Sequence, residues 1–258
     1  MSDFKIGVII PTYKHTRALP GLLDHLQTLS MPVIVIDDGN APDISAQIRD
    51  ICTGRETVKL SRTTENQGKG GAVKSGFRLA GELGWSHAIQ LDADGQHDVT
   101  ALPEIARLAA EHPHSVICAV PVYDESIPKS RKIGREITHF WVRLQTMGNE
   151  ISDSMCGLRA YPLSETLAVI SGEFIGNRMD FDTEILVHLN WRGLRNIELP
   201  VSVTYPEENV SNFRMLADNV RISLMHTRLV VQSPVRVPIR MLRRLKLPRY
   251  QRVQQTHS

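Results

Sequence analysis

The sequence predicts an α/β domain built around a mostly parallel β-sheet with helices on its faces, and three observations support this prediction. Short apolar runs recur at 5–11, 33–36, 88–91 and 116–119, each too brief for a helix and suited to a buried strand. Helical patterns separate these runs, so strand, helix and strand alternate as in βαβ units. With 258 residues, 41% of them hydrophobic, the chain can bury one large core, which favours a single domain.

The first strand and the helix after it have the clearest pattern. Residues 5–11 form a nearly continuous apolar run that ends in proline, as expected of a central parallel strand, so Pro11 and Tyr13 belong to the loop at its carboxyl end. Leucines at helical spacing predict an amphipathic helix over 18–29. A second apolar strand follows at 33–36, which completes a βαβ unit.

Two carboxylates, Asp37 and Asp38, directly follow the second strand and precede Gly39 and Asn40. One interpretation is structural, with the carboxylates capping the next helix and Gly39-Asn40 forming a turn. The other is functional, with one aspartate accepting hydrogen bonds from a nucleotide base or ribose, because ligands of open α/β sheets lie at the carboxyl ends of strands. The residues alone leave both interpretations open.

A glycine-rich segment at 66–72, Asn-Gln-Gly-Lys-Gly-Gly-Ala, follows a third and weaker strand at 58–60. Its glycines allow close approach of the backbone, and Lys69 can face an anion before a helix over 73–83. A P-loop is excluded because Lys69 is followed by Gly70 rather than by Ser or Thr. The segment is therefore a candidate anion contact of another kind.

The strand at 88–91 ends at Asp92 and Asp94, which lie on the same side of an extended backbone and are followed by the amide of Gln96. Carboxylate and amide oxygens suit Mg²⁺ or Mn²⁺, an ion that would keep waters and take phosphate oxygens as its other ligands. We therefore predict a metal and diphosphate site at this strand end.

Three other interpretations of this stretch are weaker. An EF-hand is excluded because its sixth position is His97, where Gly is needed. Capping of a helix over 101–109 accounts for Asp98 and Thr100 but leaves the two earlier aspartates unexplained. A chance Asp-x-Asp is common, but its place at the end of a buried strand favours the metal site.

Basic residues gather in a proline-punctuated segment, 120–135, after the strand at 116–119. This composition suits a mobile loop over an anionic ligand, although a solvated loop and helix face is its commoner meaning. The basic residues are Lys129, Arg131, Lys132 and Arg135. The next helix carries on one face Ile137, Phe140, Trp141 and Leu144.

Three carboxylates, Asp180, Asp182 and Glu184, open a helix that follows a strand-like segment at 155–162. Acidic residues in a first helical turn complement the helix dipole, which explains some of them. Three exceed what capping requires, so they are candidates for catalysis, with Asp182 first. A late strand is predicted at 194–203. The final helix carries on one side Leu216, Val220, Leu224 and Leu229.

The formal net charge of +2 hides an asymmetry. Residues 233–258 contain seven Arg and Lys and no Asp or Glu, so the rest of the chain carries about −5. We therefore expect a catalytic domain over 1–232 and a basic tail over 233–258. Basic residues alternate with apolar ones in the tail, which suits a segment on an anionic membrane surface. The alternative is a disordered tail that binds nucleic acid non-specifically or binds nothing.

Cysteine usage and hydropathy bear on the compartment. Cys52, Cys118 and Cys156 have no Cys-x-x-Cys spacing and lie beside apolar residues, so we interpret them as small core residues. We recognise no signal peptide and no run of about 18 apolar residues. We expect a cytoplasmic protein, peripheral on the inner face of the cytoplasmic membrane, with no specific nucleic-acid partner.

Taken together, four motifs resemble the family 2 glycosyltransferases. They are Val-Ile-Ile-Pro-Thr-Tyr at 8–13, Ile-Asp-Asp-Gly at 36–39, the segment at 66–72 and Leu-Asp-Ala-Asp-Gly-Gln-His at 91–97. Within that family, the chain resembles the branch of dolichol-phosphate mannose synthase and bacterial polyprenyl-phosphate sugar synthases. The resemblance covers about residues 4 to 215, and it lies in four motifs in the right order.

This resemblance implies a GT-A fold and an inverting transfer from a UDP- or GDP-sugar that depends on Mg²⁺ or Mn²⁺. The positions that match nucleotide contacts are Pro11, Tyr13, Asp38 with its neighbour Asp37, and Lys69. The positions that match the metal and diphosphate site are Asp92, Asp94 and Gln96. The positions that match contacts to the acceptor phosphate are Arg131 and Arg135.

The acceptor has two opposed signals. A lipid-linked phosphate acceptor is already ionised and needs a cationic cradle, which the residues around Arg131 supply. A hydroxyl acceptor needs a general base, and Asp182 stands where the polyprenyl-phosphate branch tends to have Gln. Arg214, which follows Ser-Asn-Phe instead of the usual Ser-Lys ending, is our candidate for a second cation on the leaving diphosphate. We favour the lipid-linked acceptor and keep the hydroxyl acceptor as the alternative.

Two further functions compete with glycosyl transfer. A nucleotidyltransferase should have a Gly-rich basic loop after the first strand, and here that loop begins at Pro11. A non-catalytic protein that binds nucleotide sugars should have lost part of its metal motif, and here every carboxylate is present. Both alternatives are therefore less favoured.

Overall fold

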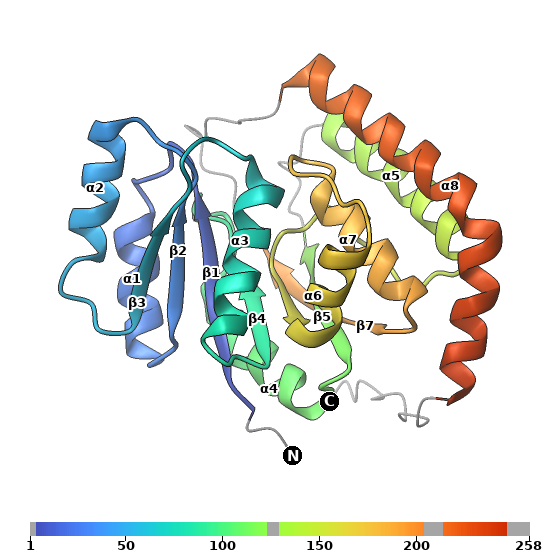
Figure 1. Ribbon diagram of the computed structural model, residues 1–258, viewed down its shortest axis with the longest axis horizontal. Helices are drawn as coiled ribbons and strands as arrows, with labels where there is room; N and C mark the ends of the chain where they lie inside the picture. Colours follow the sequence, from blue (N-terminus) through green and yellow to red (C-terminus); the bar gives the residue numbers. More distant parts are fainter. Residues whose placement is uncertain (1–3, 123–128, 204–213, 247–258) are drawn as a thin grey trace.

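The computed structural model describes residues 4–122, 129–203 and 214–246 (Figure 1). Its centre is a seven-stranded sheet in the order β3-β2-β1-β4-β6-β5-β7, in which β6 runs antiparallel to both its neighbours and the other pairs are parallel. The strands are β1 (Ile6–Thr12), β2 (Val33–Asp37), β3 (Val58–Arg62), β4 (His87–Gln90), β5 (Ser115–Val122), β6 (Arg159–Pro162) and β7 (Arg195–Ser202).

Helices cover both faces of the sheet (Figure 1). The α-helices are α1 (Leu19–Thr28), α2 (Pro42–Cys52), α3 (Lys69–Glu82), α4 (Leu102–Glu111), α5 (Lys129–Thr146), α6 (Leu163–Gly172), α7 (Phe181–Trp191) and α8 (Met215–Lys246), and a 3₁₀ turn, η1 (Val99–Ala101), precedes α4. The predicted α/β class, the strands and the βαβ start are therefore confirmed.

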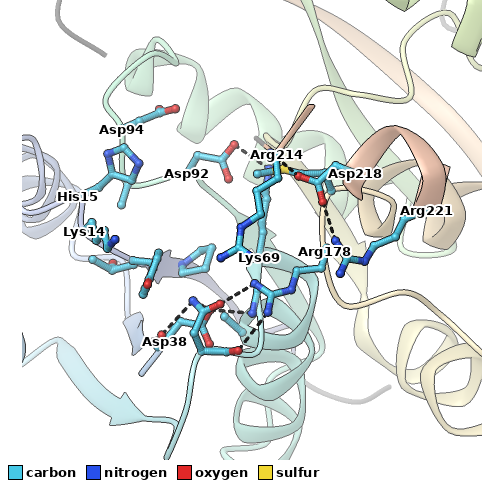
Figure 2. Close-up of a pocket in the computed structure, with 18 residues that line it drawn as sticks. Lys14, His15, Asp38, Lys69, Asp92, Asp94, Arg178, Arg214, Asp218 and Arg221 are labelled. Carbon is cyan, nitrogen blue, oxygen red and sulfur yellow. Dashed lines mark hydrogen bonds and ion pairs between the residues drawn. The ribbon is translucent and has the colours of Figure 1, made fainter. Parts of the chain in front are cut away.

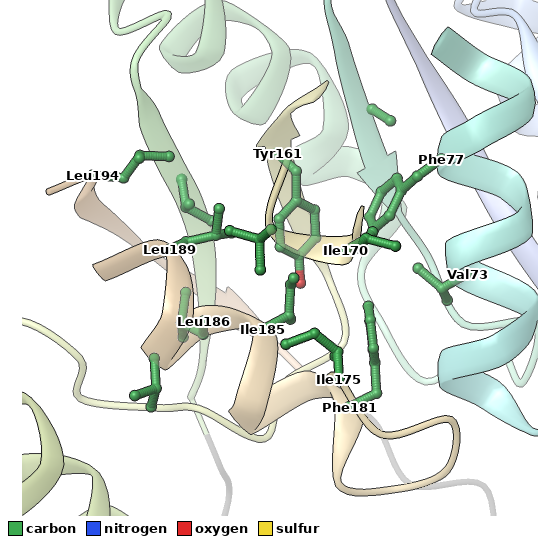
Figure 3. Close-up of a cluster of buried hydrophobic side chains, with 14 of the residues drawn as sticks. Val73, Phe77, Tyr161, Ile170, Ile175, Phe181, Ile185, Leu186, Leu189 and Leu194 are labelled. Carbon is green, nitrogen blue, oxygen red and sulfur yellow. The ribbon is translucent and has the colours of Figure 1, made fainter. Parts of the chain in front are cut away.

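The sheet separates two hydrophobic cores, which explains the continuous apolar runs. Ile9 faces the core under α3, α6 and α7, whereas Val8 and Ile10 face the core under α1 and α4. In the first core, shown in Figure 3, the rings of Phe77 and Tyr161 pack edge to face with centroids 5.1 Å apart. A strand buried on both faces needs apolar residues at every position, so its sequence does not alternate.

The three cysteines are buried and free, as expected of core residues. Burial raises the pKa of the Cys52 thiol to about 11 and the pKa values of Cys118 and Cys156 to about 12. Thiols with such high pKa values stay protonated at neutral pH and are poor nucleophiles. Within the described residues, no helix is long and apolar enough to cross a membrane.

The structure corrects the prediction of a basic loop over 120–135. Its second half forms the first turns of α5. Of the predicted apolar face of α5, Trp141 packs against α8, whereas Ile137, Phe140 and Leu144 are exposed. Val142, which was not assigned to that face, is buried. The reason is tertiary, because α8 packs along α5 on the side of His226, whose ring stacks on Trp141.

Helix α8 runs without interruption across the expected boundary between 232 and 233. It changes direction in its second half (Figure 1), where Pro234 and Pro238 cannot donate backbone hydrogen bonds. Leu229 is buried, but Leu216, Val220 and Leu224, which were predicted to share its side, are exposed. Part of the predicted tail, 247–258, lies outside the described residues.

Three basic residues of the predicted tail bind the protein body. Arg236 forms an ion pair with Glu173 at 2.8 Å. Arg240, which is buried, donates to Asn190 Oδ1 at 2.8 Å. Arg244 donates to the Leu194 carbonyl oxygen at 2.9 Å and forms an ion pair with Glu150. These three side chains anchor α8, so they are not directed at an external surface as the sequence suggested.

Candidate active site

A cavity of about 400 Å³ opens at the carboxyl ends of β1, β2 and β4, beside the N-terminus of α3 (Figure 2). The strand order reverses between β1 and β4, which is where ligands of open α/β sheets bind. Segments distant in sequence, around Arg178 and at the start of α8, close its other side. Its lining includes many of the residues predicted from the sequence, namely Pro11, Tyr13, Asp38, Lys69, Asp92, Asp94 and Arg214.

Lys69 ties together two carboxylates that lie 90 positions apart in the sequence. Its Nζ is 2.8 Å from Asp92 Oδ2 and 2.8 Å from Asp182 Oδ2. Burial alone would lower the pKa of Lys69, but Asp182 and Asp92 outweigh it and hold that pKa above its usual range. Burial likewise tends to raise the pKa of Asp92, yet Lys69 and His97 hold it well below its usual range. Both shifts favour the charged forms, so Lys69 and Asp92 form an ion pair at neutral pH.

Two glycines make room for this cluster. Gly68 has a φ of +87° and precedes the first residue of α3, a conformation that side chains rarely adopt. A Cβ at Gly157 would lie 2.6 Å from Lys69 Nζ and 2.5 Å from Asp92 Oδ2. Any larger residue at position 157 would displace the ion pair.

Asp182 is held from beneath by buried polar side chains. Gln90 Nε2 donates to Asp182 Oδ1 at 2.7 Å, and Arg159 Nη1 donates to the Asp182 carbonyl oxygen at 2.6 Å. Tyr161 donates its hydroxyl to Gln90 Oε1 at 3.4 Å. Gln90 and Arg159 are fully buried. With Lys69 on Oδ2 and Gln90 on Oδ1, both carboxylate oxygens of Asp182 have partners.

Sequence reasoning missed Gln90 and Arg159. A usable signal existed, because Gln90 is the polar exception in the apolar run at 88–91 and Arg159 is a charge inside a buried strand. The Nε and Nη2 atoms of Arg159 have no hydrogen-bond partner, which marks it as an unusual buried cation.

Asp92 and Asp94 are the residues best suited to a divalent metal. Burial raises the pKa of Asp94, and repulsion from the Asp92 carboxylate raises it further. A cation would relieve that repulsion. The Gln96 backbone donates to Asp94 Oδ1 at 3.1 Å. The described residues contain no cluster of three His, Cys, Asp or Glu, so further ligands would come from Gln96, water or phosphate. These oxygen donors fit Mg²⁺ or Mn²⁺, with water and phosphate oxygens completing the ligand shell.

Asp38 organises the loop beside the cavity. Its carboxylate accepts hydrogen bonds from Gln67 N at 2.8 Å, Gly68 N at 2.9 Å and Asn66 Nδ2 at 2.9 Å. Burial raises the pKa of Asp38, although these backbone hydrogen bonds oppose the effect. The Asp38 side chain therefore shapes one wall of the cavity.

Asp37 has a different position from its neighbour. Its Oδ2 accepts from Ser45 Oγ of α2 at 2.6 Å, and its Oδ1 accepts from Asn40 Nδ2 at 2.8 Å. Asp37 is buried and does not line the cavity. Of the two interpretations of this residue, its contacts favour the structural one.

Cations dominate the opposite wall of the cavity, as Figure 2 shows for Arg178, Arg214 and Arg221. Arg178 donates to Asn66 Oδ1 at 2.5 Å, and Arg221 donates to Asp218 Oδ1 at 3.0 Å. Together with Lys69 they make this wall suitable for a diphosphate. Arg178 and Arg221 were missed because they belong to no motif and reach the cavity only through the fold.

Several predicted site residues lie elsewhere. Asp180 Oδ1 accepts from the Arg178 backbone at 3.1 Å, and Glu184 accepts from the Gly176 backbone at 2.7 Å and pairs with Arg228. These two carboxylates hold the segment before α7 and do not line the cavity. Arg135 forms an ion pair with the buried Asp153. The side chains of Lys129, Arg131 and Lys132 lie outside the described part of the structure.

Comparison with known proteins supplies an independent result. The model of Glycosyl transferase family 2 matches residues 7–185. A UDP-N-acetylglucosamine--dolichyl-phosphate N-acetylglucosaminyltransferase of Methanococcus voltae is 24% identical over 228 residues, which are 82% of this chain and 90% of the relative. An undecaprenyl-phosphate mannosyltransferase of Micrococcus luteus is 28% identical over 218 residues, which are 82% of this chain and 87% of the relative.

A solved structure shows the same fold. The mannosyltransferase PcManGT of Pyrobaculum calidifontis, in complex with GDP-Man and Mn²⁺, superimposes with a TM-score of 0.57 at 16% identity. The match covers 94% of this chain and 75% of that protein.

Proposed function

Because the chain belongs to glycosyltransferase family 2, with a GT-A fold and relatives named for transfer to polyprenyl phosphates, we propose that it moves a sugar from a UDP- or GDP-sugar to a lipid-linked phosphate with inversion. One observation carries this proposal. Lys69 joins Asp92, at the end of β4, to Asp182, at the start of α7, at the edge of a cavity whose far wall is cationic. This arrangement suits a donor whose nucleotide and sugar lie on opposite sides of a diphosphate.

The donor would lie across the carboxyl ends of β1 and β2. The base and ribose would contact Pro11, Tyr13 and the loop held by Asp38, all of which line the cavity. The diphosphate would lie between Lys69 and Arg214. Arginine recognises phosphate oxygens through paired N–H groups, and Lys69 adds a point charge. These contacts would hold the donor with the bond between the sugar and the diphosphate toward the ion pair of Lys69 and Asp182.

A divalent metal would be held by Asp92, Asp94 and Gln96. Bound there, Mg²⁺ or Mn²⁺ would neutralise the negative charge that builds on the leaving diphosphate. Arg214 would supply a second positive charge to the same group. The Mn²⁺ in the complex of the Pyrobaculum mannosyltransferase supports this choice of cofactor.

Asp182 favours a phosphate acceptor over a hydroxyl acceptor. A hydroxyl must lose a proton during attack, so a general base needs a free oxygen within about 3 Å of it. Asp182 Oδ2 accepts from Lys69 and Oδ1 accepts from Gln90. An ionised phosphate needs no base, and Asp182 would then hold Lys69 in place. Transfer to a hydroxyl, with Asp182 as the base, is the second candidate and requires Lys69 to leave Oδ2.

Basic residues at the start of α5 are the proposed contacts of the acceptor phosphate. We keep Arg131 in this role. Arg135 has a different one, because its ion pair with Asp153 stabilises the helix that carries Arg131. The two arginines are one helical turn apart, so a change at Arg135 should act through the position of Arg131.

The test measures release of nucleoside diphosphate by the purified protein with Mn²⁺ or Mg²⁺ and a panel of UDP- and GDP-sugars, with and without a polyprenyl phosphate. For a phosphate acceptor, Arg131→Ala should raise the acceptor KM steeply, whereas Asp182→Asn should keep most of kcat. A collapse of kcat in Asp182→Asn with an unchanged acceptor KM would establish the hydroxyl alternative.

A further inference from the structure

We propose that the exposed apolar face of α8 lies on an anionic lipid bilayer and presents the lipid-linked acceptor to the cavity. The second half of this inference rests on the proposed function, whereas the first half rests on the surface itself. The surface, which we call the α8 stripe, consists of Leu216, Val220, Leu224, Val231, Val235, Ile239 and Leu242.

The members of the α8 stripe belong to one side of the helix and form two runs, 216–224 and 231–242, with the exposed Thr227 between them. Its members follow one another at intervals of three, four or seven residues, which is the spacing of a single helical face. Each of them is between 39% and 85% exposed. The opposite side of α8 packs on the domain through Met225, Leu229 and Val237, all of which are buried. Exposed apolar residues gathered on one helical face, rather than scattered singly, mark an interaction site.

Helix α5 extends the exposed apolar surface. It runs beside α8 at the edge of the molecule (Figure 1), and Gln145 donates to the His226 carbonyl oxygen at 3.1 Å. Ile137, Phe140 and Leu144 of α5 are all exposed. Two neighbouring helices therefore expose apolar side chains and bury polar ones such as Gln145 and His226. Helices that faced only water would tend to bury their apolar side chains and expose their polar ones.

The α8 stripe begins at the mouth of the cavity. Leu216 and Val220 alternate along the chain with Arg214, Asp218 and Arg221, which line the cavity. A lipid lying along the stripe would therefore have its polar end beside these charges.

Charge favours an anionic bilayer over a second copy of the chain. Helix α8 carries seven Arg and Lys and one Asp. Four of the seven form ion pairs with carboxylates, namely Arg221, Arg228, Arg236 and Arg244, and Arg240 is buried. The attraction to anionic lipid therefore rests on exposed cations such as Arg243, which would repel its counterpart in a second copy packed stripe to stripe. No described helix can span a bilayer, so α8 would lie in the plane of the interface. Because Arg236, Arg240 and Arg244 bind the body, apolar contact would supply much of the binding.

Vesicle sedimentation at low salt tests the surface without donor or acceptor, using phosphatidylcholine vesicles with and without phosphatidylglycerol. The Val231→Gln/Val235→Gln variant changes two exposed residues, so it should fold normally and bind the anionic vesicles at least about tenfold more weakly. The Val231→Leu/Val235→Leu variant enlarges the apolar face and should bind more tightly. Phe4→Gln, which changes an exposed apolar residue near the N-terminus, is the control and should bind like the wild type.

Two results would overturn the inference. One is equal binding of the anionic vesicles by the wild type and the Val231→Gln/Val235→Gln variant. The other is a dimer in analytical ultracentrifugation that the same substitutions dissociate, because a second copy would then occupy the stripe.

An activity measurement separates this inference from the proposed function. The Val231→Gln/Val235→Gln variant should keep wild-type kcat on a short, water-soluble polyprenyl phosphate and lose activity on the long-chain substrate embedded in vesicles. Failure of the wild type to use any polyprenyl phosphate would refute the proposed function, while the vesicle comparison would still decide whether the stripe binds lipid.

Discussion

The strand-end loops around the cavity and the layer formed by α5, α7 and α8 distribute polarity in opposite ways. In the loops, Asp38, Asp92 and Lys69 surround a cavity, and the sheet below them is mostly apolar, with Gln90 and Arg159 as buried polar exceptions. In the helical layer, His188 and His226 are buried, while many apolar side chains of α8 are exposed. The first pattern is that of a domain in water with one polar site. The second is the pattern expected from the proposed lipid contact, and it places ionisable groups where burial changes their pKa values.

The largest expected effect tests the strand-end loops around the cavity, which we call the strand-end half. Asp94→Asn should lower kcat by about 10³, which is about 4 kcal/mol of barrier, because it removes a proposed metal ligand. It should not lower the free energy of unfolding, since it relieves repulsion from Asp92. Steady-state kinetics and urea unfolding measure the two quantities, with Asp50→Asn on α2 as an exposed control. Full activity in excess EDTA would contradict the metal site.

Two leucines of α8, one buried and one exposed, test the layer formed by α5, α7 and α8, which we call the helical half. Leu229 is buried and Leu224 is 60% exposed on the same helix. Leu229→Ala should lower the free energy of unfolding by about 3 kcal/mol through lost packing, whereas Leu224→Ala should change it by less than about 0.5 kcal/mol. Urea unfolding of both variants decides the matter. Similar losses would mean that both leucines are packed in solution.

Acid should lower the stability of the helical layer because two of its histidines are buried. Burial lowers the pKa values of His188 and His226 to about 4. The unfolded chain then binds protons that the folded protein does not, so stability present above pH 6.5 is lost as the pH falls from about 6.5 toward about 4. Each histidine should lower the free energy of unfolding by on the order of 2 kcal/mol at pH 4.5.

The measurement is the difference in unfolding free energy between pH 7.5 and pH 4.5. His226→Gln should reduce that difference by its own share. An unchanged difference in His226→Gln would show that burial of His226 does not oppose protonation.

The smallest predicted effect joins the two halves. Gln90→Met leaves Asp182 Oδ1 without its donor while keeping a side chain of similar size. We expect kcat to fall about tenfold, or about 1.4 kcal/mol of barrier, with the donor KM little changed. Kinetics well below the melting temperature exclude a loss through unfolding. A wild-type kcat would mean that Lys69 alone is sufficient to hold Asp182.

Much of the strand-end half could be predicted because its signals are local. The runs ending at Pro11, Asp38 and Asp92 are short strands followed at once by polar residues. Parallel strands bring their carboxyl ends to one edge of the sheet, so adjacency in sequence translates into adjacency in space. The metal motif and the anion contact at Lys69 need no knowledge of the rest of the fold.

The tertiary structure decided what had no local signal. Lys69 meets Asp182 only because α3 and α7 pack on the same core, and Arg178 reaches the cavity from a segment without a motif. Helical periodicity in α5 and α8 predicted faces but not which face would be packed, because both helices carry apolar residues on more than one side. Which side is buried depends on the partner helix, and a single helix sequence does not contain that information.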